Sequence, residues 1–81
     1  MSGDPLAPLQ TTALGFYRHY KGHLYEVIGN ARHSETLQSM TLYRALYGAQ
    51  ELWVRPASMF EETIQVNGLE QPRFTKVTES L

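Results

Sequence analysis

Short runs of residues that favour β-strands alternate with turn signals along most of this chain. Asn67-Gly68 is the strongest of these signals, because both central residues of a type I′ hairpin turn need a positive φ. Tyr20-Lys21-Gly22 predicts a three-residue hairpin loop in which the glycine supplies the positive φ. Short strands separated by such turns are typical of an all-β domain. The predicted strands cover residues 16–19, 23–31, 40–46, 51–55, 63–66 and 73–77.

One short helical segment is predicted between the fourth and fifth of these strands. Pro56 is favourable at the first position of a helix, and acidic residues follow it. Five or six short strands can curl around a single core, and a helical turn before a late strand is similar to the arrangement in SH3-like barrels. We therefore expect a mainly β fold, a small SH3-like barrel of five to six short antiparallel strands with one short helical turn.

The length of 81 residues leaves room for one domain. Residues 1–13 contain Pro5 and Pro8 and have no hydrophobic periodicity, so they predict a flexible N-terminal tail. Residues 14–81 are expected to form a single small β-barrel domain. No apolar run approaches the roughly 20 residues that cross a bilayer, so we expect no membrane partner. The absence of cysteine favours a cytoplasmic location.

Strand periodicity divides the hydrophobic residues between a core and a surface. On the fourth strand, Trp53 and Arg55 share one face, opposite Leu52 and Val54. An exposed face that carries Tyr17, Tyr43, Trp53, Arg18 and Arg55 would suit stacking on bases or binding of a cation, and we expect Trp53, Arg55, Tyr17 and His33 to border one patch. The alternative is that Trp53 caps the core and the tyrosines are half-buried with solvated hydroxyls. The predicted core consists of Phe16, Tyr25, Val27, Leu42, Leu52, Val54, Met59, Phe60, Ile64 and Phe74.

Three histidines and one carboxylate lie in the first half of the chain and raise the question of a metal site. The set of His19, His23, His33 and Glu35 could bind zinc or nickel in principle, but its spacing matches no established motif. We therefore predict no metal and no cofactor. Ser34, beside His33, is interpreted as turn chemistry, because neighbours in sequence rarely converge into a hydrolytic triad.

Several motifs together resemble one family of short bacterial proteins. They are Gly15-Phe16-Tyr17-Arg18-His19-Tyr20-Lys21-Gly22, His33-Ser34-Glu35-Thr36, Leu46-Tyr47-Gly48, Trp53-Val54-Arg55-Pro56 with Met59-Phe60, and Pro72-Arg73-Phe74. This combination, over about residues 15–77, is similar to the family named domain of unknown function 1653. The family has no established activity. The resemblance emphasises polar positions that serve either a site or an internal hydrogen-bond network: His19, His33, Ser34, Glu35, Thr36 and Arg55.

These observations lead to three functional hypotheses. The first is a binding module that uses a polar-aromatic face for a ligand, a peptide or a nucleic acid, although the net charge of -1 does not favour nucleic acid. The second is a small hydrolase or metal-dependent enzyme that uses His19, His33 and Glu35. The third is a structural homodimer. The candidate ligand-binding residues are Tyr17, His19, His33, Ser34, Glu35, Thr36, Trp53 and Arg55.

Overall fold

The computed structural model describes residues 7–78, which form a mainly β fold with one short helix, as predicted. The strands are β1 (Gly15–His19), β2 (Leu24–Arg32), β3 (Ser39–Ala45), β4 (Leu52–Pro56), β5 (Thr63–Val66), β6 (Leu69–Pro72) and β7 (Phe74–Lys76). The helix α1 (Ala57–Phe60) follows β4 directly. Sequence reasoning missed β6, because the segment that contains it ends in proline and has few β-branched residues.

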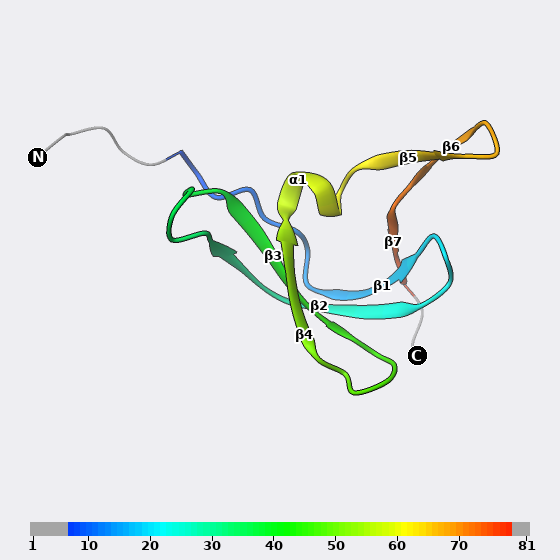
Figure 1. The fold of residues 1–81 in the computed structure, drawn as a ribbon, viewed down its shortest axis with the longest axis horizontal. Helices are drawn as coiled ribbons and strands as arrows, with labels where there is room; N and C mark the ends of the chain where they lie inside the picture. The colour runs from blue at the N-terminus through cyan, green and yellow to red at the C-terminus, as the bar shows by residue number, and fades with distance from the viewer. Residues whose placement is uncertain (1–6, 79–81) are drawn as a thin grey trace, which may run out of the picture.

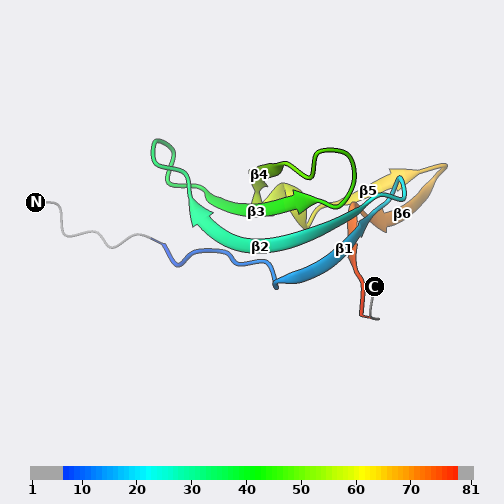
Figure 2. The same cartoon turned by 90° about the horizontal axis from the view of Figure 1, so that it is seen from below.

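The strands form two antiparallel sheets (Figure 1). The larger sheet has the order β4-β3-β2-β1-β7, and β5 and β6 pair with each other in a hairpin that extends from the body. The two edge strands of the larger sheet, β4 and β7, do not pair with each other, so residues 7–78 form an open, curved sheet and not a closed barrel (Figure 2). Within these residues, no helix is long and apolar enough to cross a membrane.

The predicted hairpin turns are confirmed by the backbone. Gly22 has a φ of 108°, and its N–H donates to the His19 carbonyl at 2.7 Å, which closes the loop between β1 and β2. Asn67 and Gly68 have φ values of 52° and 77°, the pair of positive angles that a type I′ turn requires. These two turns fix the registers of the β1–β2 and β5–β6 hairpins.

We call the two sides of the larger sheet the inner face and the outer face. The inner face carries Val27, Tyr43 and Trp53, which lie opposite one another across β2, β3 and β4. The sheet curves toward α1, which packs on the inner face and contributes Phe60 to the core (Figure 2). A β-bulge between Val27 and Gly29 shifts the register of β2 against β3, and such bulges increase the bend of a strand.

The core is an aromatic cluster on the inner face. Phe60 and Phe74 are stacked with ring centroids 4.0 Å apart, and Tyr17 packs edge-on against Phe60 at 5.3 Å. The cluster is completed by Val27 and Tyr43. Val27, Phe60 and Phe74 were predicted core residues, whereas Tyr17 and Tyr43 were not. A core rich in aromatic rings gains area burial and also edge-to-face contacts of about 0.5–1.5 kcal/mol each.

The predicted core is wrong at three positions. Leu52, Val54 and Met59 are exposed, at 53%, 57% and 45%. The two β4 residues lie on the outer face, because the inner face of this strand is occupied by Trp53 and Arg55. Phe16, Tyr25, Leu42 and Ile64 are half-buried. Hydrophobicity alone placed Leu52 and Val54 inside, but the register of β4 against β3 places them outside.

Part of the N-terminal segment lies along the sheet. The Thr12 N–H donates to Asn30 Oδ1 at 2.8 Å, and the Asn30 side-chain amide donates to the Thr12 carbonyl at 3.1 Å. The hydroxyls of Thr12 and Thr41 form a buried hydrogen bond of 2.9 Å. Residues 1–6 of the predicted flexible tail lie outside the described residues. The hydrogen bonds of Thr12 show that the described part of the tail contacts the sheet. The flexibility of the tail stays a prediction.

Candidate functional site

A chain of aromatic rings leads from the core to the surface at the end of the inner face that α1 leaves open. Phe74 contacts His19 at 4.9 Å and Tyr25 at 5.5 Å between ring centroids. The Tyr25 hydroxyl forms a hydrogen bond of 2.9 Å with the Tyr47 hydroxyl, and Tyr47 stacks on His23 at 4.3 Å. The described surface at this end is therefore aromatic, with hydroxyl and imidazole groups at its rim.

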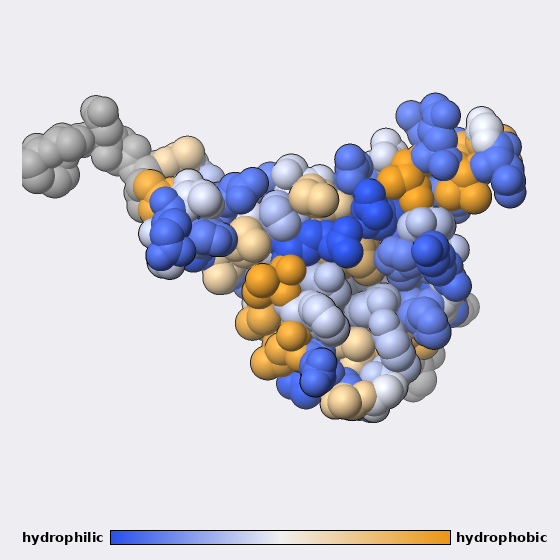
Figure 3. Space-filling model, viewed as in Figure 1, coloured by the Kyte–Doolittle hydropathy of each residue, from blue (hydrophilic) through white to orange (hydrophobic). Residues whose placement is uncertain are grey.

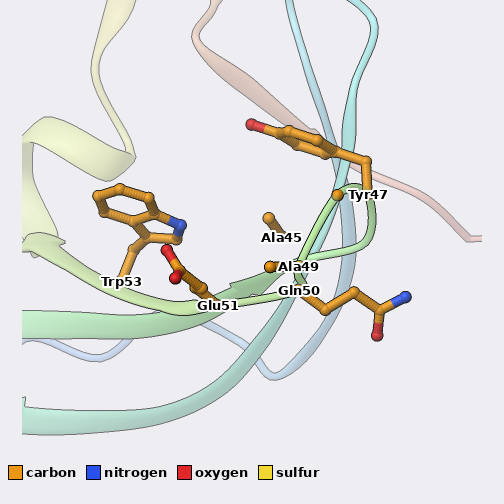
Figure 4. Close-up of a pocket in the computed structure, with 7 residues that line it drawn as sticks. Ala45, Tyr47, Ala49, Gln50, Glu51 and Trp53 are labelled. Carbon is orange, nitrogen blue, oxygen red and sulfur yellow. The ribbon is translucent and has the colours of Figure 1, made fainter.

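A small pocket opens beside this aromatic surface, at the edge strand β4. Its volume is about 100 Å³, and Ala45, Tyr47, Glu51 and Trp53 are among its lining residues. In Figure 4, Trp53 and Tyr47 stand on two sides of a gap over Ala45, and the Glu51 carboxylate points toward the indole. Gln50 also lines the pocket, but its side chain is directed away from the gap (Figure 4). We call Tyr47, Glu51 and Trp53 the β4 pocket.

Local backbone geometry explains why these side chains meet. Gly48 and Gln50 adopt positive φ values of 58° and 55°, and the Gln50 N–H donates to the Tyr47 carbonyl at 3.1 Å. This turn directs the chain back so that the Ala45 N–H donates to the Glu51 carbonyl at 3.2 Å. Glu51 and Trp53 then point to the same face of the sheet, because side chains alternate with a period of two. The short side chain of Ala45 leaves the gap between the aromatic rings.

Arg55 lies two residues beyond Trp53 on the same face. Its Nε donates to the Tyr43 hydroxyl at 3.4 Å, and its guanidinium carbon lies 5.8 Å from the Phe74 ring centroid. That distance allows a cation–π interaction with the core ring. Among residues 7–78, Arg55 forms no ion pair with a carboxylate.

The titration behaviour of the aromatic surface follows from its burial and its neighbours. Burial lowers the pKa of His19, and the positive charges of Arg55, Arg73 and Lys21 lower it further, as does His23. His19 Nδ1 also accepts the Lys21 backbone N–H at 3.2 Å, which requires that nitrogen to be unprotonated. His19 is therefore neutral at pH 7. Burial raises the pKa of Tyr25 to about 12, with a further contribution from its hydrogen bond to Tyr47, so its hydroxyl stays protonated.

The polar loop after β2 forms a local hydrogen-bonded turn. His33 Nδ1 accepts backbone N–H groups from Glu35 at 3.1 Å and from Thr36 at 3.2 Å. Glu35 Oε1 lies 3.7 Å from the same nitrogen. Thr36 Oγ1 accepts the Gln38 N–H at 3.3 Å, and Ser34 is exposed. These bonds satisfy the turn and leave Glu35 in solvent.

The predicted single patch of four residues is wrong. Trp53 and Arg55 lie together, but Tyr17 is only 8% exposed and its hydroxyl donates to the Ala13 carbonyl at 2.7 Å. Trp53 lies in the same row as Tyr43 and Val27, and His33 comes six residues after Val27 along β2, a distance of about 20 Å. The nine residues of β2, which span about 30 Å, also separate His33 from His19.

The predicted enzyme alternative also loses its geometric basis. His19, His33 and Glu35 cannot converge on one substrate or metal ion, because β2 separates His19 from the other two. In the part of the chain that the structure describes, no group of three or more potential metal-ligating side chains forms.

Sequence reasoning missed two residues of the β4 pocket. Glu51 could have been found, because it shares the strand parity of Trp53 and Arg55. Tyr47 could not have been placed from periodicity, because it lies in the loop between β3 and β4 and its position depends on Gly48 and Gln50.

Comparisons with known proteins agree with this fold and give no activity. The chain matches a family model described as protein of unknown function (DUF1653) over residues 15–76. It is similar to a crystal structure of a protein belonging to DUF1653 from Bordetella bronchiseptica, with a TM-score of 0.79 and 33% sequence identity. That similarity covers 91% of this chain and 97% of the other. No curated protein matches. The protein therefore belongs to the DUF1653 family of proteins of unknown function.

Proposed function

We propose that this protein is a binding module that receives an extended polypeptide segment along the free edge of β4, with a basic side chain of that segment in the β4 pocket. One observation carries the proposal. A pocket lined by two aromatic rings and a carboxylate opens directly beside a strand edge that has no partner strand among residues 7–78. Addition of a strand to a sheet edge is a common way for a domain to bind a peptide, and side-chain pockets then supply the specificity.

The chemistry of the β4 pocket favours a cation. Trp53 and Tyr47 offer aromatic faces, which attract ammonium and guanidinium groups, and Glu51 supplies a negative charge. Small-molecule sites commonly have volumes of about 300–1,000 Å³. A pocket of about 100 Å³ is suited to the head of one side chain and not to a whole small molecule. A lysine or arginine side chain on a strand has both the positive charge and the small head group that this pocket requires.

The backbone of β4 supports the strand-addition part of the proposal. Along a strand, the backbone N–H and C=O groups of successive residues point alternately toward the two sides of the strand. The hydrogen bond from Ala45 to Glu51 shows that the backbone of Glu51 points toward β3, so the backbone groups of Trp53 and Arg55 also point toward β3. The N–H and C=O groups of Leu52 and Val54 are then directed away from the sheet. β4 has β3 as its only strand neighbour among residues 7–78, which leaves these four backbone groups available to an added strand.

Nucleic acid is the less favoured ligand class. The chain has a formal net charge of -1, and a carboxylate lines the pocket, so a phosphate backbone would meet repulsion at Glu51. A cytoplasmic location belongs to the same proposal and rests on the absence of cysteine.

The proposal is tested with a capped pentapeptide that has a central arginine between valines and threonines. Trp53 is the one tryptophan of the chain, so its fluorescence reports directly on the pocket. We expect the arginine peptide to change this fluorescence saturably, and the isosteric citrulline peptide to bind more weakly. Glu51→Gln should weaken arginine-peptide binding about two- to five-fold, the range of an exposed ion pair.

Glu70→Gln is the matched control, because Glu70 is an exposed carboxylate on β6. It should leave the affinity unchanged. Equal affinities for the arginine and citrulline peptides, with no effect of Glu51→Gln, would contradict a cation-binding pocket.

A further inference from the structure

We infer that the strand bound at the β4 edge is β4 of a second copy of this chain, arranged antiparallel about a two-fold axis that passes beside Trp53. This inference rests on the proposed function, because it names the segment and the basic side chain that fill the same site. In a symmetric interface each surface must complement itself. The sequence of β4 must therefore fit the same sequence running in the opposite direction.

Backbone geometry selects one register for this pairing. The outward-directed backbone groups belong to Leu52 and Val54, and these two residues form hydrogen-bonded pairs when Leu52 of one copy lies opposite Val54 of the other. Trp53 then lies opposite its own symmetry mate as a non-hydrogen-bonded pair. Four backbone hydrogen bonds join the copies and extend each five-stranded sheet into one of ten strands.

This register is also complementary in charge. In an antiparallel pair centred on residue 53, two facing residues lie equally far from residue 53 in opposite directions. Glu51 of each copy therefore lies opposite Arg55 of the other. Both residues share the inner-face parity of Trp53, and side chains are closest in non-hydrogen-bonded pairs such as this one. The arrangement places the backbone of the second copy's Arg55 opposite Glu51. The guanidinium of that Arg55, which contacts Tyr43 and Phe74 in a single chain, then turns toward the carboxylate to form the pair. Each dimer contains this opposite-charge pair twice.

The apolar surface of β4 fits the same arrangement. Leu52 and Val54 are 53% and 57% exposed on the outer face, and a hydrophobic patch runs along β4 in Figure 3. In the dimer these side chains lie against the equivalent pair of the second copy, while the Trp53 rings, each 52% exposed in one chain, meet on the inner face. Pro56 has no N–H and ends the set of residues that can donate to an added strand.

A single cysteine tests the register most directly. The chain has no cysteine, so Trp53→Cys introduces one thiol per copy. A non-hydrogen-bonded antiparallel pair has a Cα separation of about 4.5 Å, which lies within the range of a disulfide. Mild oxidation should therefore produce a covalent dimer of Trp53→Cys. Thr75→Cys, an exposed position on the other edge strand β7, is the control and should remain monomeric under the same oxidation.

Charge reversal tests the pairing of Glu51 with Arg55 in protein that retains Trp53. Sedimentation analysis of the unmodified protein should show a monomer–dimer equilibrium, measured up to about 1 mM because an interface of one strand is small. Glu51→Arg and Arg55→Glu should each weaken the dimer at least about ten-fold, because each places like charges opposite each other twice. The double variant should restore dimerisation. Thermal melts verify that each variant is folded, since Arg55 also contacts Tyr43 and Phe74.

The outcomes separate this inference from the proposed function. A protein that stays monomeric over the whole concentration range overturns the dimer, and the peptide titration then decides the proposed function by itself. A dimer whose affinity ignores both charge reversals, or in which Trp53→Cys gives no more covalent dimer than Thr75→Cys, uses another surface and also overturns the inference. Covalent dimerisation specific to residue 53, together with rescue by the double reversal, supports it.

Discussion

The two edge strands of the larger sheet differ in length, burial and charge. β4 has five residues, and Leu52, Trp53 and Val54 are each more than half exposed. β7 has three residues, begins with the buried Phe74 and ends with Lys76, whose amine lies 5.6 Å from the Tyr17 ring. Short strands and lysine side chains are common devices that prevent a sheet edge from pairing with another chain. β7 has both devices, whereas β4 carries a charge and a proline only at its end, at Arg55 and Pro56, and leaves Leu52, Trp53 and Val54 exposed.

The aromatic residues of the two edge strands lie in different environments. Phe74 attaches β7 to the core, where it stacks on Phe60 and packs against Tyr43. Trp53 has the same strand-edge location but keeps half of its surface in solvent. The proposed function uses this exposed half of the indole.

Truncation of the two aromatic residues should separate the two edge strands most clearly. Phe74→Ala should lower the free energy of unfolding by about 3–5 kcal/mol, because it leaves a cavity beside Phe60. Trp53→Ala should cost about 1 kcal/mol or less in the monomer, since the indole is half exposed. Urea denaturation at low protein concentration measures both. Similar losses for the two variants would remove the distinction between the structural edge β7 and the proposed binding edge β4.

A smaller effect is expected at two glycines near the two edges. Gly15 in β1 has a φ of 130°, and an added Cβ would lie 2.7 Å from the Lys76 amine on β7. Gly48, in the loop that leads to β4, has a φ of 58° and open space around it. Gly48→Ala should cost about 1–2 kcal/mol through backbone strain alone. Gly15→Ala should cost more, up to about 3 kcal/mol, because its backbone angle is less accessible to alanine and Lys76 must move. Thermal melts give the order, and the reverse order would contradict the packing of Lys76 over β1.

A weaker difference between the two edges should appear as a pH dependence of stability near β7. His19 pairs with Phe74 across β1 and β7, and burial and nearby positive charges lower its pKa in the folded state. As the pH falls below about 6.5, the unfolded state therefore binds more protons at this histidine than the folded state does. The free energy of unfolding decreases as the pH falls further, until the folded-state pKa is passed. Above about pH 6.5 this contribution to stability is fully present.

His19→Asn keeps an acceptor for the Lys21 N–H but does not titrate. The free energy of unfolding of this variant should depend less on pH between about 7 and 5 than that of the unmodified protein. Equal slopes for the two proteins would show that His19 is not the responsible group. Hydrogen exchange should detect the acid-induced loosening at β7 before β4.

Local signals in the sequence predict much of the fold. Gly22 and Asn67-Gly68 identify two hairpins correctly, because turns with positive φ depend on a few neighbouring residues. The separation of inner and outer faces depends instead on which strands pair. Period two correctly put Trp53 and Arg55 on one face, but it could not decide which face α1 covers. The core aromatic residues Tyr17 and Tyr43 were missed for this reason.

The candidate site was only partly predictable for the same physical reason. Trp53 and Arg55 were named from the sequence, and the His33–Thr36 loop was recognised as a unit. The loop's distance from Trp53 follows from the length and direction of β2, which no local motif contains. Glu51 and Tyr47 complete the pocket only after the turn through Gly48 brings the chain back against β3. Long-range pairing therefore decides which polar residues share a surface.

The β5–β6 hairpin has a consequence for engineering of this protein. Its base is fastened by Arg73, whose backbone N–H donates to the Glu62 carbonyl at 2.9 Å and whose guanidinium binds the Glu62 carboxylate at 2.9 Å. Beyond that base, the two strands pair only with each other in the described chain. Extra residues inserted between Asn67 and Gly68 would lengthen the hairpin without changing the registers of the larger sheet. This tip is therefore a graft site for an affinity tag, a fluorophore or a foreign epitope.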